Sequence, residues 1–575
     1  MALTCKTIYT DNNGYCFYNI DFPRQESKIG ILYFIPELEI NINEGSYRML
    51  KNSNERFFYG IQDKDGVYRL KPLKKDDLQI MKTEKPWPKE LTTYTKSKVL
   101  GEGSYGKVTG YDTENYVLKE SLNMDDFISP DIIKEIAIYR YLKEINGLCI
   151  PRFHGFKLGK KIEIQMEKGI TTLQSILENV KREDANRIMF RLAKCLKLIS
   201  SQGIVNFDLK PANMVIVSDS ISKWGQDEKE RYTRYIDNIK QVQIIDWGLA
   251  ELIYTPKRIQ RTKQTLWWRS PECLHSYYIP VDYKADIFSL GLIFYQLYTN
   301  KPYPIFMADD ETQQKRTILR YITNIDRNKV STIASINLEF KKALEGPSTA
   351  LKFKELILSG NHYFNDAFNI KGEKFDPNFA DLLSKMLEIN PIYRIDYDDI
   401  ILHPYFQGMK RESLPRLPLL LNEIKPLKNI SPRDHRSIIF KTIKKVMTNS
   451  SNNAKLLALQ IVDLLFNRDT QNFPEENMHH RLTLACFVAS SIYDEIPLEY
   501  YSIVDELNFS PNSNLMLKYF NQIFEVFDGN FLIPTLWSYC ELKNEECNFN
   551  KIVEYYLSDN IYKVPFRDVD LSRFF

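Results

Sequence analysis

Three glycines in the stretch LGEGSYGKV, residues 100–108, constrain this chain more than any other feature of its sequence. Gly101, Gly103 and Gly106 let the backbone approach a polyphosphate and present amide donors with no side chain in the way. The same G-x-G-x-x-G pattern opens a helix in dinucleotide-binding oxidoreductases. Here the glycines are followed by KVTGY and then by YVLK, and both segments favour strands. The pattern therefore predicts a phosphate-binding hairpin within a sheet and disfavours a dinucleotide-binding oxidoreductase.

Two charged residues follow the glycines at a suggestive distance. Lys119 ends the YVLK strand, and Glu135 lies on an amphipathic helix predicted for residues 130–144. The lysine could hold the α- and β-phosphates of ATP while the glutamate pairs with it and fixes its position. Taken singly, a solvated lysine and a surface glutamate are the simpler interpretation. Further motifs in the right order must therefore decide.

Those motifs follow along the chain. NFDLKPAN at 206–213 supplies Asp208, Lys210 and Asn213, and IIDWG at 244–248 supplies Asp246 after an apolar strand. Phosphoryl transfer needs a metal to neutralise the charge that develops on the transferred group, and a carboxylate to accept the proton of the attacking hydroxyl. Asn213 and Asp246 are candidate oxygen ligands for Mg²⁺, and Asp208 is the candidate base.

With SPE at 270–272, DIFSLG at 286–291 and a helix leading to Arg394, residues 94–408 resemble a eukaryotic-type protein kinase domain. This resemblance implies a bilobal α+β fold that uses ATP and Mg²⁺ and acts on protein substrates. It also implies an ion pair between Glu272 and Arg394, and a bracing role for Asp286 beneath the catalytic loop.

The same resemblance assigns the site residues. The catalytic residues would be Asp208, Lys210 and Thr265, and the metal ligands Asn213 and Asp246. Lysine at the second position after the base is the serine/threonine pattern. ATP would contact the glycine hairpin, the Lys119 strand and the hinge through Leu100, Gly101, Glu102, Gly103, Ser104, Tyr105, Gly106, Lys107, Val108, Val117, Lys119, Glu135, Met166 and Glu167.

Among protein kinases, the chain is similar to the cyclin-dependent kinases in SPDIIKEI at 129–136, in GEGSYG and in TLWWRSPE. In that family the helix corresponding to the one between Ser129 and Glu144 binds cyclin, which turns the glutamate toward the lysine. Trp267, Trp268 and Arg269 resemble the elements that shape a pocket for proline after the phosphorylated residue. We therefore expect substrates with Ser/Thr-Pro sites, although Gln264 replaces the usual valine.

Several departures from that family fall around the activation loop. Phe207 and Glu251 replace two arginines that grip a loop phosphate, and Gln260 stands at the usual phosphothreonine position. Lys134 alone of the three basic partners remains, and a glutamate in the cluster would repel a phosphate. We therefore hypothesise a loop that is active without phosphorylation, with Gln260 as a neutral stand-in.

Two further departures support an alternative function. Asn206 replaces the usual histidine and Trp247 the usual phenylalanine, and both changes alter the hydrophobic spine behind the site. A pseudokinase that binds nucleotide or a partner as a scaffold, without transferring phosphate, is the alternative interpretation.

Apolar residues at helical spacing after Lys455 and Arg481 predict an all-helical bundle at the C-terminus. The block resembles one repeat of a cyclin box, with Asp463 in its second helix. Ile492 and Phe520 occupy the positions where cyclins carry a lysine and a glutamate that contact the kinase, which predicts an apolar contact in their place. A bundle that touches no kinase is the alternative.

The patterns divide the chain into four parts. These are a β-rich extension at 1–93, the kinase-like domain at 94–408 with an exposed insertion at 219–240, a proline-rich linker at 409–433, and the cyclin-like helical domain at 434–575. The linker is long enough for the last domain to reach the small lobe of the same molecule. The fold class is thus α+β, with an all-α bundle behind it.

Composition adds exclusions. A net charge of +3 over 575 residues gives no reason to expect nucleic acid as a direct partner, and no apolar run is long enough to predict a membrane contact. The eight cysteines are scattered, and we expect them to be reduced and mostly buried. The absence of a signal-like N-terminus predicts an intracellular protein of the cytoplasm or nucleus. The abundance of Asn, Ile, Lys and Tyr suggests an AT-rich genome; if that genome is of a large DNA virus, the compartment is in the host cell.

Overall fold

A computed structural model describes the strands within residues 9–72 and most of the chain from residue 97 onward. Residues 1–95 and 96–575 form separate compact units. The described ranges after residue 96 are 97–103, 106–111, 116–120, 130–145, 147–158, 162–217, 241–259, 263–275, 280–322, 375–388, 390–409, 433–468, 478–511 and, with short gaps, 513–574. The predicted insertion at 219–240 and almost all of the predicted linker lie outside these ranges.

The first unit, where the sequence predicts a β-rich extension, is a meander of antiparallel strands. Its sheet has the order β3 (Arg24–Ser27), β4 (Gly30–Ile42), β5 (Gly45–Asn52), β6 (Phe57–Gln62) and β7 (Tyr68–Pro72). Pairing of β4 with β5 is irregular between Ile35 and Glu39, where Pro36 has no N–H to donate. A short pair, β1 (Tyr9–Thr10) and β2 (Cys16–Phe17), precedes this sheet.

The second unit begins with a five-stranded antiparallel sheet in the order β11-β12-β10-β9-β8. Its strands are β8 (Ser97–Gly103), β9 (Gly106–Tyr111), β10 (Tyr116–Glu120), β11 (Phe153–Leu158) and β12 (Ile162–Glu167). The glycines therefore join two strands, as predicted, and the helix of a dinucleotide-binding fold is absent at this position. Helix α2 (Pro130–Tyr141), which ends in a short 3₁₀ turn, follows β10.

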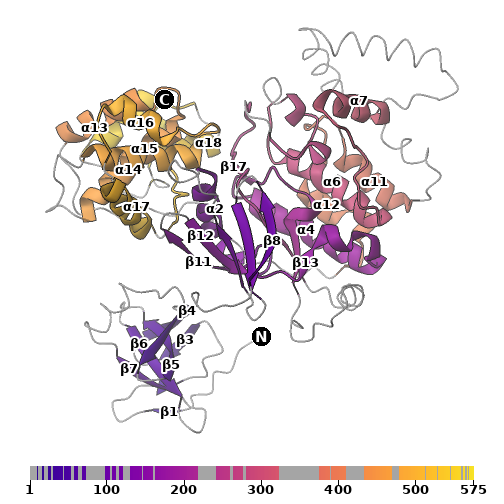
Figure 1. The fold of residues 1–575 in the computed structure, drawn as a ribbon, viewed down its shortest axis with the longest axis horizontal. Coiled ribbons are helices and arrows are strands. Elements are labelled where there is room, and N and C mark those ends of the chain that lie inside the picture. Colours follow the sequence, from indigo (N-terminus) through magenta and orange to yellow (C-terminus); the bar gives the residue numbers. More distant parts are fainter. Residues whose placement is uncertain are drawn as a thin grey trace. The chain divides into compact units, whose positions relative to one another are not determined.

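A helical lobe follows the sheet (Figure 1). It contains α3 (Leu173–Ile176), α4 (Arg182–Ser200), α6 (Lys284–Thr299), α7 (Glu311–Ile322), α11 (Pro377–Met386) and α12 (Tyr397–Leu402). Helix α6 is buried from Ala285 to Leu297 because α4 and α11 pack against it. Helix α4 begins separately from α3, after Lys181, with Glu183 and Asp184 in its first turn.

Short strand pairs connect the catalytic segments to this lobe. Strand β14 (Ile204–Val205) pairs with β17 (Glu251–Leu252), and β13 (Thr171–Thr172), β15 (Met214–Val217) and β16 (Gln241–Ile244) form a small sheet. Glu272 and Arg394 form a buried bidentate ion pair at 2.6 and 2.9 Å, as the resemblance implied.

The expectation of reduced cysteines is wrong for one pair. Cys149, just before β11, and Cys195 on α4 form a disulfide with a Cα–Cα separation of 5.5 Å. The two residues lie 46 positions apart and share no motif, so only the packing of α4 beneath the sheet brings them together. Among the described residues, Cys273, Cys486, Cys540 and Cys547 are free thiols.

The C-terminal helices are α13 (Arg433–Val446), α14 (Asn452–Arg468), α15 (Met478–Tyr493), α16 (Tyr500–Leu507), α17 (Ser513–Phe527), α18 (Leu536–Lys543) and α19 (Phe549–Leu557). Helix α15 is buried along nearly its whole length, which makes it the centre of the bundle. Arg436 and Asp463 form a buried ion pair, 3.1 Å from Nη2 to Oδ2, that joins α13 to α14.

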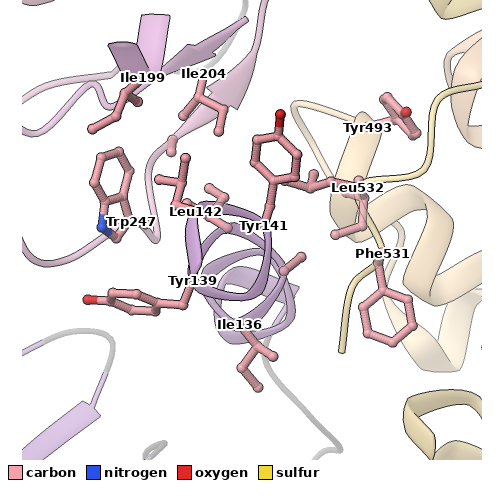
Figure 2. Packing of buried hydrophobic residues seen from close by; sticks show 14 of the residues in the cluster. Ile136, Tyr139, Tyr141, Leu142, Ile199, Ile204, Trp247, Tyr493, Phe531 and Leu532 are labelled. Carbon is pink, nitrogen blue, oxygen red and sulfur yellow. The ribbon is translucent and has the colours of Figure 1, made fainter. Parts of the chain in front are cut away.

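These helices share one continuous apolar core with the kinase-like lobes. Helix α15 packs against α2, and the rings of Phe156 on β11 and Phe524 on α17 meet edge to face, with centroids 5.3 Å apart. Figure 2 shows Phe531 and Leu532 beside α2, with Tyr493 close to Leu532. The C-terminal helices therefore cover one side of α2. None of the described helices is long and apolar enough to cross a bilayer.

Candidate active site

Lys119, on the central strand β10, contacts two other predicted site residues, Glu135 and Asp246. Its buried ammonium donates to both carboxylate oxygens of Glu135, at 3.0 and 2.7 Å, and to Oδ1 of Asp246 at 3.1 Å. Burial by itself would lower the pKa of Lys119, but the carboxylates of Glu135 and Asp246 outweigh burial and raise it. Lys119 therefore stays a cation, held by two carboxylates.

The catalytic loop orients the carboxylate of Asp208 from three directions. Oδ1 accepts a hydrogen bond from the hydroxyl of Thr265 at 2.6 Å. Oδ2 accepts from Lys210 Nζ at 2.8 Å and from Asn213 Nδ2 at 2.7 Å. Lys210 also donates to the Thr265 hydroxyl at 2.9 Å. Asp208, Lys210 and Thr265, predicted from distant motifs, thus form one hydrogen-bonded group.

Asp286 holds the backbone of this loop from below. Its carboxylate accepts the backbone N–H groups of Asn206 at 2.7 Å and Phe207 at 3.0 Å. Phe207 has a φ of 58°, a conformation that non-glycine residues avoid, and these bonds help to hold it. Burial raises the pKa of Asp286 to about 7, although the two N–H donors favour its ionised form.

The two residues that depart from the usual spine are accommodated by the surrounding fold. The side chain of Asn206 accepts from the backbone N–H of Asp208 at 2.9 Å and donates to the backbone carbonyl of Asp246 at 3.4 Å. Trp247 is fully buried, and Figure 2 shows its ring beneath Ile199. Asn206 therefore links the catalytic loop to Asp246, and the ring of Trp247 packs in the core, where its indole N–H has no hydrogen-bond partner among the described residues.

The donor set of Asn213 and Asp246 fits magnesium. Asn213 uses its amide nitrogen to donate to Asp208, which leaves its carbonyl oxygen as an acceptor. The side chain of Asp246 remains 27% exposed. No group of three or more His, Cys, Asp or Glu side chains suited to a metal occurs among the described residues. Two oxygen ligands suit Mg²⁺, which relies on one or two carboxylates together with substrate phosphates.

The glycine hairpin joins the two strands β8 and β9 of the same sheet. Gly103 pairs with Gly106 across the turn, while Ser104, Tyr105 and the side chain of Glu102 lie outside what the structure describes. Leu100 is 49% exposed and lies against Gly110, where an added Cβ would come within 2.7 Å of it. Lys107 and Val108 on β9 are half-buried, and Val108 pairs with Lys119.

The predicted hinge residues end strand β12. Met166 and Glu167 pair with Val117 and Tyr116 of β10, so the hinge lies beside the Lys119 strand. The backbone N–H of Glu167 donates to the carbonyl of Arg152 at 2.8 Å, and its carboxylate accepts from Gln243 at 3.4 Å. The side chain of Glu167 is therefore occupied by the fold, while Val117 and Met166 are buried apolar residues.

Sequence reasoning treated Gln264 as a mere replacement of valine and overlooked its backbone. Its φ is 69°, and its carbonyl accepts from Arg269 Nε at 3.2 Å and Nη2 at 2.9 Å. Its side chain donates to Ser289 at 2.9 Å and accepts from the N–H of Ser270 at 2.7 Å. Sequence reasoning also overlooked Lys263, a buried lysine that contacts Glu251.

Comparison with known proteins agrees with this geometry. Residues 94–406 match the protein kinase domain family, so that the match covers more than half of the chain and the chain belongs to this family. It is 25% identical over 373 residues to mitogen-activated protein kinase 10 of Oryza sativa subsp. japonica, which is 62% of this chain and 55% of that protein. It is 25% identical over 342 residues to cyclin-dependent kinase B2-1 of the same plant, 56% of this chain and 91% of the relative. A third relative, mitogen-activated protein kinase pmk-3 of Caenorhabditis elegans, is 29% identical over 335 residues, 53% of this chain and 62% of its own length.

The Thr265 hydroxyl generates the first prediction. Thr265→Val keeps the shape of the side chain but removes the hydrogen bonds to Asp208 and Lys210. A hydrogen bond to a charged group contributes about 1.5–3 kcal/mol, so we expect kcat for phosphoryl transfer to fall about ten- to a hundredfold. Steady-state kinetics should show an unchanged KM for ATP. The matched control is Thr265→Ser, which retains the hydroxyl and should stay within a few fold of wild type.

Proposed function

We propose that this protein transfers the γ-phosphoryl group of ATP to serine or threonine hydroxyls of proteins. The observation that carries this proposal is the convergence of Lys119, Glu135 and Asp246 on one side, and of Asp208, Lys210 and Thr265 on the other. Separate motifs supply these residues, and structural ion pairs alone give no reason for all of them to meet at two adjoining points.

Each side chain has a role in this reaction that its contacts support. Lys119, fixed by Glu135, binds the phosphates; Asp208 accepts the proton of the attacking hydroxyl; Lys210 and Thr265 hold that carboxylate in place and donate toward the acceptor. Asn213 and Asp246 are the residues that would hold Mg²⁺, which neutralises charge on the phosphates when bound. General-base assistance of this kind is worth about 100- to 10,000-fold.

Phosphotransfer itself is tested with radiolabelled ATP and a generic protein acceptor. Wild-type protein should label the acceptor, and Asp208→Asn should lower the rate at least about a hundredfold, because an amide cannot accept the proton. Equal, background-level labelling by both proteins, with ATP still raising the thermal unfolding temperature, would instead support the pseudokinase scaffold. Phosphoamino-acid analysis of the labelled acceptor should give phosphoserine or phosphothreonine.

The backbone at Gln264 supports substrates with proline after the phosphorylated residue. Because the Gln264 carbonyl is already occupied by Arg269, it cannot accept the backbone N–H of the next substrate residue. An unpaired N–H in a desolvated site costs about 1–3 kcal/mol, and proline has no N–H to leave unpaired. The replacement of the usual valine by Gln264 is compatible with this geometry, because it is the backbone carbonyl that Arg269 occupies.

This arrangement predicts a preference that one substitution can relax. Wild-type protein should phosphorylate a Ser-Pro peptide about five- to a hundredfold faster than its Ser-Ala counterpart. Arg269→Met frees the Gln264 carbonyl. It should therefore lower the ratio of kcat/KM for the Ser-Pro peptide to kcat/KM for the Ser-Ala peptide. Arg269 also pairs with Glu311 at 2.5 Å, so Glu311→Gln is the matched control and should keep the preference. Equal rates on both peptides with wild-type protein would remove the proline assignment.

The C-terminal helices supply a partner for α2 within the same unit. Gly529, with a φ of 72°, lies so close that an added Cβ would be 2.9 Å from both Ile136 Cγ2 and Phe156 Cε1. Ile136 directly follows Glu135, so pressure at this point acts on the residue next to the ion pair. We propose that these helices act in cis, as a cyclin does in trans, by holding α2 with Glu135 toward Lys119. One turn after Phe520, the ring of Phe524 meets that of Phe156 on β11, and Phe520 packs against Phe524.

Alanine substitutions at two glycines with positive φ distinguish the effect of this contact from the effect of backbone strain. Gly529→Ala introduces overpacking against α2 that costs about 1–3 kcal/mol, and we expect kcat to fall about tenfold. Gly408→Ala is the matched control, because Gly408 also has a positive φ, 89°, but no heavy atom within 4 Å of the added Cβ. If both variants keep wild-type activity, the cis contact has no part in activation. Specific activity that does not change on dilution would distinguish contact in cis from contact between molecules.

A further inference from the structure

Glu251, on the short strand β17, belongs to a buried cluster of charges outside the ATP side of the site. The residue is 2% exposed, and its carboxylate lies between two buried ammonium groups, Lys134 Nζ at 3.1 Å and Lys263 Nζ at 2.8 Å. A third, Lys257, is 4.0 Å away. In sequence these residues lie up to 129 positions apart, so the fold alone assembles the cluster.

Each neighbour of Glu251 adjoins a different part of the site. Lys134 precedes Glu135, whose carboxylate binds Lys119. Lys263 precedes Gln264 and Thr265, which face the acceptor side. Glu251 itself pairs through its backbone with Val205 of β14, the strand that leads into the catalytic loop. Glu251 therefore joins the helix that carries Glu135 and the acceptor segment through its carboxylate, and the strand before the catalytic loop through its backbone.

We infer that Glu251 is a positioning residue. By binding Lys134 and Lys263 together, it holds the ATP side and the acceptor side of the site in a fixed position relative to each other. The negative charge that this role needs is built into the chain, so an added phosphate is not required to supply it. The hypothesis drawn from sequence gave the role to Gln260, which lies outside the described residues, and regarded Glu251 as a source of repulsion. The inference rests on the proposed phosphotransfer activity.

The electrostatics support a carboxylate that stays ionised. Burial opposes the charge of Glu251, but Lys134, Lys263 and Lys257 outweigh burial and lower its pKa to about 2. An acid whose pKa in the folded protein lies below its ordinary value stabilises the fold at every pH above that ordinary value, which is 4.5 for Glu251. The stabilisation is therefore complete at neutral pH. It is lost as the pH falls from 4.5 through about 2. Lys257 also interacts electrostatically with Glu541 of α18, so the cluster extends to the C-terminal helices.

The test compares variants of the full chain after phosphatase treatment, with intact mass confirming that no phosphate remains. Wild-type protein should keep kcat within twofold of its untreated value. Glu251→Gln should lower kcat per folded molecule about 30-fold or more, and it should also lower the thermal unfolding temperature, because it removes the charge that lies between the Lys134 and Lys263 ammonium groups. Glu251→Asp, which restores the charge, should recover at least part of that loss.

A control variant and a second readout distinguish positioning from general stability. Glu272→Gln breaks a buried ion pair, with Arg394, that includes none of Glu251, Lys134 and Lys263, and should leave kcat per folded molecule within a few fold of wild type. Hydrogen exchange at α2 and at 263–265 should rise together in Glu251→Gln and stay protected in Glu272→Gln. Because hydrogen exchange needs no activity, it tests whether Glu251 holds the two segments together even if wild-type protein transfers no phosphate.

The outcomes are separable. Loss of wild-type activity on phosphatase treatment by tenfold or more, or Glu251→Gln with wild-type kcat, would overturn the inference. So would increased exchange at only one of the two segments. A wild-type protein that never labels an acceptor would refute the proposed phosphotransfer, while joint exchange of α2 and 263–265 in Glu251→Gln would still support the positioning role.

Discussion

The whole arrangement depends on one buried ion pair, between Lys119 on a rigid central strand and Glu135 on helix α2. The strand holds Lys119 through pairs on both sides, with Val108 and Ile164, so its place in the sheet is determined locally. Glu135 has no such anchor, because a helix can shift as a unit. Whatever holds α2 therefore decides whether the cation next to Asp246 is fixed.

Helix geometry explains how α2 meets three demands at once. Consecutive residues of an α-helix point about 100° apart, so Lys134, Glu135 and Ile136 face three different neighbours. They contact Glu251, Lys119 and the segment around Gly529, respectively. A charge inside the kinase-like domain and an apolar surface from the C-terminal helices thus act on adjacent residues, and the middle residue forms the pair with Lys119. Ionic and apolar contacts at α2 are complementary parts of one restraint.

Strained backbone marks the same region. Phe207, Asp246 and Gln264 all have φ between 58° and 69°, and each is held by hydrogen bonds to its own or a neighbouring peptide group. Such conformations persist only where the surrounding structure compensates for them. They set the direction of the catalytic loop, of Asp246 and of the Gln264 carbonyl, and so control where phosphate, metal and acceptor can be placed.

Much of this was predictable, because local sequence determines local chemistry. The glycine hairpin, the strand of Lys119, helix α2 and the loop of Asp208 each follow from short patterns of residues, and the order of those patterns predicted the family. Other features were not predictable from pattern. Cys149 and Cys195 belong to no motif, and the residue type of Gln264 does not reveal that its φ is positive. Glu251 was read as repulsive because its partners Lys134 and Lys263 are neighbours only in space.

The sequence by itself thus determined which chemical groups are present and which elements carry them, since strand, turn and helix preferences act over a few residues. Tertiary structure alone decided which charges meet. The sign of an electrostatic contribution depends on distance and burial: a glutamate is unfavourable beside a phosphate and favourable between two buried lysines. Only the packing of α2, β17 and the 263–265 segment placed Glu251 in the second setting.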